Sequence, residues 1–371
     1  MKQRTDFLYL SEPDMIEAGV LDVKNCVNVV EEVFSLIGKG DYLMGGPNGN
    51  DHGIKMTFPD ESEFPNMPLN GPDRRFMAMI GYLGGKFNVA GEKWYGSNIA
   101  NPARGLPRSV LMVMLNDPDT CEPFALMSAN LVSAMRTGAV PGVAVRYLTD
   151  NNAKICAVVG AGPVNFSCVR AILSECPSLK KLVIFDLFTD KADSFGQNIT
   201  EEFGVEYSVV SELDEALKEA DVVSVAASRV KPVVLKGDQL KDNCLVLQTG
   251  AMQGDDAFWR DFNVVLDNPK MHEAYVADVK KSSDPEAANK AMMCGDMYDR
   301  IEAGEVKPLQ QMTSLGDIIN DKTFTKPEGK TLFISGGQIA MDLGWSYQIY
   351  QQAKEKGIGT PLNLWQEPHW L

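Results

Sequence analysis

From residue 153 onward the chain alternates short, uninterrupted apolar runs with segments of helical periodicity, and this rhythm restricts its fold more than any other feature. Such runs are typical of strands in a parallel sheet, because helices cover both faces of that sheet and neither face meets water. The alternation therefore predicts a doubly wound α/β domain over residues 138–337. The runs lie at 154–159, 181–185, 205–210, 221–225, 244–248 and 331–334.

The first apolar run leads into Gly160-Ala161-Gly162-Pro163-Val164-Asn165, which opens a helix. A strand, a glycine turn and a helix in this order bind the pyrophosphate of a dinucleotide. Gly160 would make the tight turn and Gly162 would let the backbone approach the phosphates, while the helix N-terminus supplies donors and partial positive charge. The third position of the fingerprint is Asn165 rather than Gly or Ala, so the turn alone also fits a mononucleotide or methyl-donor site.

Asp186 ends the next apolar run, 24 residues after Gly162, where a carboxylate binds the ribose hydroxyls. Because a carboxylate repels a 2′-phosphate, Asp186 favours NAD over NADP, although Lys191 lies nearby in the sequence. The sequence therefore predicts a Rossmann dinucleotide-binding domain. The expected cofactor-binding residues are Gly160, Gly162, Pro163, Val164, Asn165, Asp186, Ala227, Ser228, Gly250 and Gly336.

The segments on either side of this domain have a different pattern. Strand-like runs at 76–83 and 110–115 are typical of an antiparallel or mixed sheet. A helix is expected over about 338–356, and because it must bury its apolar stripe, we expect it to join the N-terminal part. The prediction is an α/β protein of two domains, an α+β domain made of 1–137 plus 338–371 and the Rossmann domain over 138–337.

The composition excludes several classes of protein. The chain has 371 residues, with 35 Lys plus Arg against 50 Asp plus Glu and a formal net charge of −15. This balance argues against binding to nucleic acid or to an anionic membrane surface. No stretch approaches the ~20 apolar residues of a membrane-spanning helix, and the N-terminus does not resemble a signal peptide, so we expect a cytoplasmic protein.

Cysteine and histidine usage gives little reason to expect a metal. The seven cysteines include no Cys-x-x-Cys pair, and most lie in apolar runs, which predicts buried, reduced thiols. The three histidines, His52, His272 and His369, are far apart and lack the spacing of metal ligands. We therefore predict no metal site.

Further motifs follow one another along the chain: 91–98 with its lysine, 101–109 with Gly-Leu-Pro-Arg, 133–139 with Arg-Thr-Gly-Ala, 314–319, 333–337, 342–343 and 353–360. Their order resembles the ornithine cyclodeaminase/mu-crystallin family, and the resemblance covers residues 55–365. It implies a homodimer whose subunits combine an NAD(P)-binding Rossmann domain with a substrate-binding and dimerisation domain formed by both termini. It also implies hydride exchange between nicotinamide C4 and the α-carbon of an amino acid, imine or secondary amine.

The resemblance assigns roles to two residues. Arg136 matches the family's carboxylate-binding arginine, and a guanidinium can hold a carboxylate through two hydrogen bonds. Lys93 matches a lysine close to the substrate, where a desolvated ammonium exchanges protons more readily. The alternatives are a structural arginine that braces its helix and an exposed strand lysine between neighbouring aromatic residues.

Three further residues are candidates with balanced alternatives. Lys55 lies where the family often has a carboxylate-binding basic residue, and Arg108 resembles the subgroup whose substrates carry a second carboxylate. A surface salt bridge explains Arg108 equally well. Asp342 matches a family aspartate near the nicotinamide, and helix capping is the alternative.

The chain departs from the cyclodeaminase pattern after the run at 244–248. Met252 stands where we expect an aspartate, and Asp255 or Asp256 could replace it only if the loop is rearranged; both could equally begin the next helix. We therefore expect a net oxidoreductase that acts on an amino acid, an imine or an N-substituted (carboxyalkyl) amino acid, with NAD as cofactor. The alternatives are a redox-neutral ornithine or lysine cyclodeaminase and a non-catalytic mu-crystallin-like ligand-binding protein.

Overall fold

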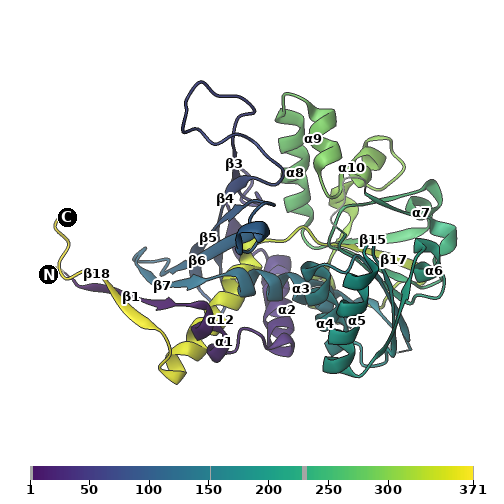
Figure 1. Cartoon of the computed structure of the whole chain (residues 1–371), viewed down its shortest axis with the longest axis horizontal. Coiled ribbons are helices and arrows are strands. Elements are labelled where there is room, and N and C mark those ends of the chain that lie inside the picture. The colour runs from purple at the N-terminus through teal and green to yellow at the C-terminus, as the bar shows by residue number, and fades with distance from the viewer. Residues whose placement is uncertain (1–2, 151, 228–231, 371) are drawn as a thin grey trace. The chain divides into compact units, whose positions relative to one another are not determined.

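The computed structural model describes residues 3–150, 152–227 and 232–370, which form two compact units (Figure 1). One unit comprises the chain up to Asp22, Gly40–Met135 and the chain from Gln338 onward. The other comprises Val23–Lys39 and Arg136–Gly337. Below they are called the mixed-sheet unit and the parallel-sheet unit.

The parallel-sheet unit is built on a sheet in the order β10-β9-β8-β11-β13-β17-β15-β16, in which every pair of neighbours is parallel. The chain enters the sheet at β8, runs outward through β9 and β10, and then returns to β11 on the other side of β8. The strands are β8 Ile155–Val159, β9 Lys181–Phe185, β10 Glu206–Val210, β11 Val222–Val225, β13 Leu245–Gln248, β15 Phe262–Leu266, β16 Thr313–Ser314 and β17 Lys330–Ile334. This arrangement confirms the predicted α/β Rossmann class.

Helices and a small second sheet complete the parallel-sheet unit. They are α2 Val23–Lys39, α4 Pro163–Glu175, α5 Thr189–Phe203, α6 Leu213–Leu217, α7 Asp256–Asp261, α8 Pro269–Lys281, α9 Pro285–Ala291, α10 Gly295–Glu302 and α11 Leu315–Asn320. Two short parallel strands, β12 Val233–Leu235 and β14 Met252–Gly254, pair with each other. Helix α3, Asn130–Leu148, contributes its residues from Arg136 onward.

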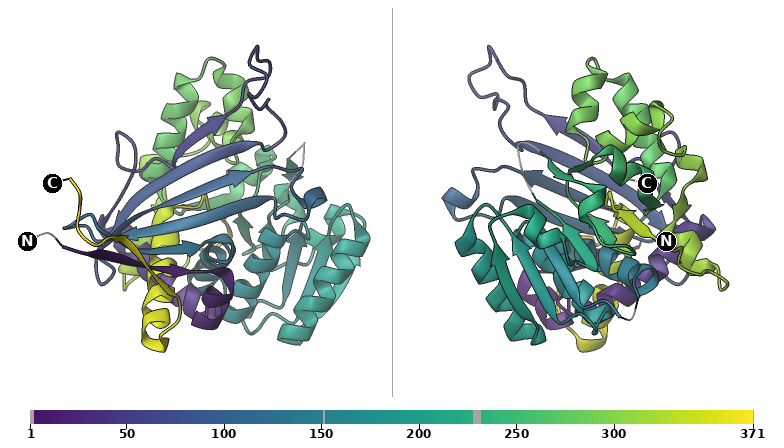
Figure 2. Two further views of the ribbon diagram at one scale, coloured as in Figure 1. Left: turned by 60° about the vertical axis from the view of Figure 1, so that its left-hand side comes forward. Right: turned by 90° about the vertical axis from the view of Figure 1, so that its right-hand side faces the viewer.

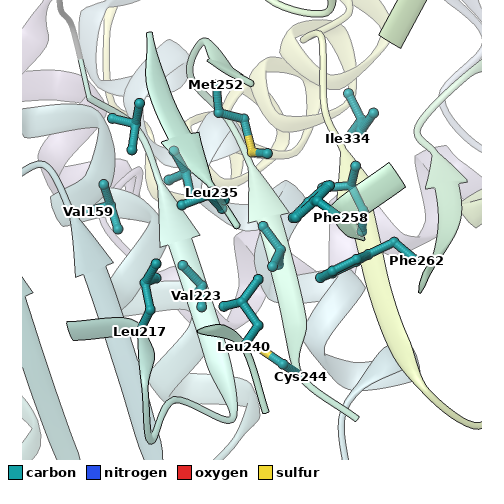
Figure 3. Close-up of a cluster of buried hydrophobic side chains, with 14 of the residues drawn as sticks. Val159, Leu217, Val223, Leu235, Leu240, Cys244, Met252, Phe258, Phe262 and Ile334 are labelled. Atoms are coloured by element: carbon teal, nitrogen blue, oxygen red, sulfur yellow. The ribbon is translucent and has the colours of Figure 1, made fainter. Parts of the chain in front are cut away.

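One core cluster of this unit shows why the predicted strands are uninterrupted apolar runs. Val159, Val223 and Ile334 project from β8, β11 and β17 and pack with Leu217 and Phe258 from α6 and α7 (Figure 3). All five are fully excluded from solvent. Burying each aliphatic or aromatic side chain contributes about 1.5–3 kcal/mol.

The structure differs from the expected domain boundaries at α2, which belongs to the parallel-sheet unit. A Cβ atom added to Gly38 of α2 would lie 2.6 Å from the backbone of Gly316 in α11. Two glycines facing each other thus let α2 and α11 approach to backbone contact. Helical periodicity in the sequence shows which face of a helix is apolar, but it cannot tell against which domain that face packs.

The mixed-sheet unit contains a sheet in the order β18-β1-β7-β6-β5-β4-β2, with β3 paired to β4. Strands β1 and β18 run side by side, which joins the two ends of the chain in one unit, and only the β1–β7 pair is parallel (Figure 1). The strands are β1 Thr5–Leu10, β2 Tyr42–Met44, β3 Ile54–Thr57, β4 Arg75–Leu83, β5 Val89–Ser97, β6 Ser109–Asn116, β7 Pro123–Ser128 and β18 Thr360–Trp365.

Helix α12, Ile339–Lys356, packs along one face of this sheet on β4, β5 and β6, and α1, Glu12–Ala18, packs on α12 (Figure 2). Gly81 and Gly91 are directly opposite each other on β4 and β5. A Cβ atom on either would lie 2.8 Å from Ile339 or Leu343 of α12, respectively. The missing side chains therefore allow the helix to lie close to the sheet. Among the described residues, no helix has the length and apolar character needed to cross a membrane.

We predict that only one of the seven thiols reacts quickly in the native protein. Cys121 is exposed and the other six are buried. Burial raises the pKa of Cys168 and of Cys244 to about 12, so these thiols stay protonated and unreactive. Titration with a disulfide reagent at mildly alkaline pH should show one fast equivalent, with the rest appearing only in denaturant. Cys121→Ser should abolish the fast phase, and two or more fast equivalents would contradict the prediction.

Candidate active site

The glycine turn after β8 has the geometry of a phosphate-binding turn. Gly160 has a positive φ of 93°, and a Cβ atom there would lie 2.8 Å from the Cα of Ala227. Gly162 is the N-cap of α4, and the space in front of it is open, because a Cβ atom there would meet nothing within 4 Å. Backbone N–H groups at the start of α4, with Pro163 and Val164 in its first turn, are thus accessible to an anion.

Asn165 has a different role from the one expected. Its side chain is fully buried and its amide donates to the carbonyl oxygens of Gly160 (2.7 Å) and Ser224 (3.3 Å). The hydroxyl of Ser224 donates to the Asn165 Oδ1 atom at 2.6 Å. The side chain therefore fastens the turn to β11 and has no group directed at a ligand. The third fingerprint glycine serves close helix–strand packing, and here an amide joins the two elements instead.

Asp186 lies beside the glycine turn. Its Oδ2 atom accepts the Ala161 N–H at 2.7 Å, and its Oδ1 atom accepts the Phe188 N–H at 2.9 Å. Each carboxylate oxygen keeps a second lone pair for a ribose hydroxyl. Phe188 is 60% exposed next to this carboxylate, with the Lys191 ammonium 4.6 Å from its ring centroid.

Other predicted cofactor residues lie at the carboxyl ends of the neighbouring strands. Gly250, after β13, approaches β11 so closely that a Cβ atom would lie 3.0 Å from the Cα of Ala226 and 3.2 Å from the Ala227 nitrogen. Side chains at Gly160 or Gly250 would collide with the backbone after β11, and the space in front of Gly162 is open, so the residues fit a dinucleotide. Gly336 follows β17 at the same edge. Ser228 lies outside the described residues.

Arg136 reaches the same edge of the sheet. It lies on α3, is 5% exposed, and a Cβ atom on Gly337 would lie 2.9 Å from its Nη1 atom. Two residues along α3, Gly138 permits backbone contact with α4, since a Cβ atom there would lie 2.3 Å from the Ser167 carbonyl oxygen. The guanidinium is therefore placed at the turn after β17 in the parallel-sheet unit.

Lys93 and Asp342 form a buried ion pair in the mixed-sheet unit. The Lys93 Nζ atom lies 2.9 Å from the Asp342 Oδ2 atom, and the side chains are 2% and 0% exposed. Lys93 points from β5 toward α12 because it is two residues from Gly91, and alternate residues of a strand share a face. Both alternative interpretations are wrong: Lys93 is not exposed, and the N-cap of α12 is Gln338 rather than Asp342.

Lys55 and Arg108 lie at the margins of the mixed sheet. Lys55 is opposite Met77, and Met77 is opposite Tyr95, so the register places Lys55 on the face that carries Lys93. The Arg108 Nε atom lies 2.6 Å from the Asp73 Oδ2 atom, and its side chain is 49% exposed. The surface salt bridge is thus present, and a second role of Arg108 remains a prediction.

The segment after β13 leaves no carboxylate at the position expected of a cyclodeaminase. Met252 lies in β14, is 3% exposed and belongs to the apolar core cluster (Figure 3). Asp255 caps α7 by accepting the Phe258 N–H, and Asp256 pairs with Arg300 at 2.7 Å. Both aspartates therefore belong to the start of a helix. Within the described part of the chain, no cluster of His, Cys, Asp and Glu could hold a metal ion.

Sequence reasoning missed one polar cluster near this edge. Asp267, His272 and Tyr298 are buried and hydrogen-bonded to one another beyond the end of β15. The available signal was an aspartate directly after the short apolar run Phe262–Leu266, which is the pattern that identified Asp186.

The fold and the glycine turn define an α/β protein with a dinucleotide-binding type of domain. The chain belongs to the ornithine cyclodeaminase/mu-crystallin family, whose model matches residues 20–357. This confirms the resemblance seen in the motifs.

Known members of this family are similar to the chain over most of its length. It is 24% identical over 372 residues to N-((2S)-2-amino-2-carboxyethyl)-L-glutamate dehydrogenase of Staphylococcus aureus, covering 97% of the chain and 99% of that protein. It is 27% identical over 258 residues to Δ1-pyrroline-2-carboxylate reductase of Bacillus cereus, covering 68% and 74%. The fold is similar to that of the iminosuccinate reductase of Paracoccus denitrificans solved with NAD⁺, with a TM-score of 0.76, 22% identity, and coverage of 96% and 99%.

We predict that removing one partner of the Lys93–Asp342 pair is strongly destabilising. Asp342→Ala leaves a buried ammonium without its carboxylate, and the free energy of unfolding in urea should fall by about 3–5 kcal/mol. The double variant Lys93→Met/Asp342→Leu should recover most of this loss. Glu286→Ala, which removes an exposed partner of Lys290, should change stability by less than about 0.5 kcal/mol. Equal losses of stability in Asp342→Ala and Glu286→Ala would contradict the assignment of Lys93 and Asp342 as a buried pair.

Proposed function

We propose that the protein is an NAD-dependent oxidoreductase that transfers hydride at the α-carbon of an amino acid, an imine or an N-substituted (carboxyalkyl) amino acid. The observation that carries the proposal is the buried Lys93–Asp342 pair. An ion pair in the interior stabilises a fold no better than apolar residues of similar size, so its presence favours a chemical role. The family relatives named above are a dehydrogenase and a reductase of substrates in this class.

The parallel-sheet unit binds the cofactor. When bound, NAD supplies the nicotinamide C4 that accepts or donates hydride. The N–H groups at Gly162 and the start of α4 bind the pyrophosphate, and Asp186 accepts hydrogen bonds from the ribose hydroxyls. The negative charge of Asp186 disfavours a 2′-phosphate, so NAD is the cofactor. Buried, reduced cysteines fit a cytoplasmic location.

Arg136 holds the substrate's carboxylate. A planar guanidinium donates two parallel hydrogen bonds to a carboxylate in one orientation. This orientation determines where the α-carbon lies. Hydride transfer requires the α-carbon to lie close to the nicotinamide, and binding of the carboxylate brings it there. A structural role alone would not require a guanidinium at the carboxyl edge of the sheet, where ligands of open α/β sheets bind.

Lys93 exchanges a proton with the substrate nitrogen. Reduction of an imine adds hydride to carbon and a proton to nitrogen, and the ammonium of Lys93 provides that proton. Asp342 holds the ammonium in place at 2.9 Å and stabilises its charge in the interior. In the reverse direction oxidation gives an imine, which water hydrolyses to a 2-oxo acid and an amine.

A redox-neutral cyclodeaminase is the second candidate, and the structure of the segment after β13 disfavours it. That reaction is expected to use an aspartate where this chain has Met252, which is part of the core. Neither Asp255 nor Asp256 replaces it, because both serve the start of α7. A non-catalytic binding protein would not need the Lys93–Asp342 pair.

We predict that the purified protein changes NADH absorbance with at least one member of a substrate panel and that Arg136→Met removes this activity. The panel contains amino acids, cyclic imines such as Δ1-pyrroline-2-carboxylate, and 2-oxo acids paired with ammonia or amines. Loss of a charged carboxylate contact costs about 2–5 kcal/mol, so kcat/KM should fall by about 30-fold or more. NADH binding, measured by fluorescence, should be unchanged.

Arg260→Met is the matched control, because this arginine is exposed in the same unit. It should leave kcat/KM within about twofold of the unchanged protein, as expected for a surface substitution. An unaltered rate in Arg136→Met would mean that the carboxylate is held elsewhere. Proline formation from ornithine without net change in NADH would contradict the oxidoreductase and support the cyclodeaminase, an ammonia lyase.

The mixed sheet also supports a homodimer. The face opposite α12 exposes Ile80, Trp94, Val110 and Met112, which lie 53%, 45%, 51% and 38% open to solvent. They project from one face of the neighbouring strands β4, β5 and β6. Trp94 and Met112 are directly opposite each other, and Phe76 stacks on Trp94 with 5.6 Å between the ring centroids. A contiguous apolar surface of this kind marks an interface. A second copy of the chain covers it in the proposed dimer.

We predict that Val110→Glu/Met112→Glu converts the dimer into a monomer with an intact fold. Burying two carboxylates in an apolar interface without partners opposes association. Sedimentation or light scattering gives the mass, and circular dichroism reports the fold. Val234→Glu, at an exposed valine of the parallel-sheet unit, is the control and should remain dimeric. A monomeric unchanged protein, or a dimeric double variant, would refute this interface.

A further inference from the structure

A buried polar cluster lies beyond the end of β15 and has no part in the function proposed so far. It consists of Asp267 at the strand end, His272 on α8 and Tyr298 on α10, with exposed fractions of 1%, 0% and 7%. Buried charged and polar side chains are costly unless each finds a partner. The hydrogen-bond partners in this cluster connect helices α10 and α8 to the end of strand β15.

The cluster is a continuous series of hydrogen bonds. The Tyr298 hydroxyl lies 2.8 Å from His272 Nδ1, and His272 Nε2 lies 3.2 Å from Asp267 Oδ1. The other oxygen, Asp267 Oδ2, accepts the Gly336 N–H at 2.7 Å. Because a carboxylate only accepts, the network assigns the proton of a neutral His272 to Nε2, and Nδ1 then accepts from Tyr298. Burial raises the pKa of Tyr298 far above its ordinary value, so its hydroxyl remains a donor.

Asp267 clamps the backbone at the turn after β17 from two sides. Its own N–H donates to the Ile334 carbonyl at 3.0 Å, and its carboxylate accepts from Gly336. The intervening turn is therefore held at both ends by one residue. The turn is also tightly packed against α8, because a Cβ atom on Gly336 would lie 2.6 Å from the Cε atom of Met271.

The clamped turn lies against Arg136. Gly337 has a positive φ of 75°. A Cβ atom added to Gly337 would point at the guanidinium and lie 2.9 Å from the Arg136 Nη1 atom. A shift of the turn by a few tenths of an ångström would change the space in which the guanidinium lies. The position of the arginine thus depends on the conformation of Gly336–Gly337.

We propose that Asp267, His272 and Tyr298 are positioning residues that hold the Gly336–Gly337 turn and so fix the Arg136 guanidinium for the substrate's carboxylate. This inference rests on the proposed function of Arg136. The histidine and tyrosine act through Asp267: they set the rotamer of a carboxylate that would otherwise have only backbone partners. The cluster determines how tightly the carboxylate binds, and it takes no part in the hydride or proton transfer.

The first experiment measures the turn itself and does not depend on activity. Hydrogen–deuterium exchange is compared in the full-length protein and in Tyr298→Phe, which removes only the hydroxyl oxygen. Peptides covering 335–338 should exchange about tenfold faster, as expected for one lost buried hydrogen bond, while peptides of β9 should not change. Tyr207→Phe makes the same chemical change on β10, at the opposite edge of the same sheet, and should leave 335–338 unchanged.

The second experiment separates positioning from general stability. With the panel compound that has the highest kcat/KM, Tyr298→Phe and His272→Leu should raise its KM by about tenfold, the factor for one lost hydrogen bond, with kcat within about twofold. The Kd of NADH should change less than KM, because the glycine turn and Asp186 follow β8 and β9 and not β17. His272→Gln, whose amide can donate to Asp267 and accept from Tyr298, should restore KM toward its original value.

The outcomes distinguish this inference from the proposed function. If no panel compound reacts, the proposed function fails, and the exchange measurement still tests whether the cluster holds the turn. Unchanged exchange at 335–338, or equal acceleration in β9, would overturn the anchoring. Faster exchange at the turn with an unchanged KM would overturn the positioning of Arg136.

Discussion

The parallel strands of the second unit all end at one edge of one sheet, and this constraint brings together residues that are far apart in the chain. Gly160, Asp186, Gly250 and Gly336 follow β8, β9, β13 and β17, and each is placed by the end of its strand. Arg136 arrives at the same edge because Gly138 lets α3 contact α4. A glycine turn of the phosphate-binding type and a buried guanidinium thus share an edge without any need for proximity in the sequence.

A different constraint shapes the other unit, where α12 packs closely on the antiparallel strands β4 and β5. The paired glycines Gly81 and Gly91 remove the side chains that would hold the helix away. Two residues farther along β5, the lysine side chain meets Asp342 in the space that the close approach encloses. Desolvating both charges is costly, and the direct ion pair offsets that cost only while both partners are present. The close packing at two glycines therefore determines how deeply the Lys93–Asp342 ion pair is buried.

The sequence was informative where a pattern is local. Uninterrupted apolar runs predict most strands of the parallel sheet, and Asp186 stands out because it directly follows one of them. Burial of Lys93 was not readable, because it depends on α12 packing across the sheet from more than 200 residues away. The unit to which α2 belongs likewise depends on a distant residue, because Gly316 lets α11 approach α2 closely. Local periodicity gives the element and its apolar face, whereas the partner of that face is a property of the tertiary structure.

Met252 shows how deeply a difference in chemistry can be embedded in the fold. It pairs with Val233 across β12 and β14, and its side chain lies among apolar neighbours that include Leu235 and Phe258. A carboxylate at this position would enter that core without a partner, and its desolvation would oppose folding. Exchanging a net oxidoreductase for a cyclodeaminase would therefore require the segment between β13 and α7 to be rebuilt so that residue 252 faces outward. What residue 252 can contribute chemically depends on the path of a short strand as much as on the identity of one side chain.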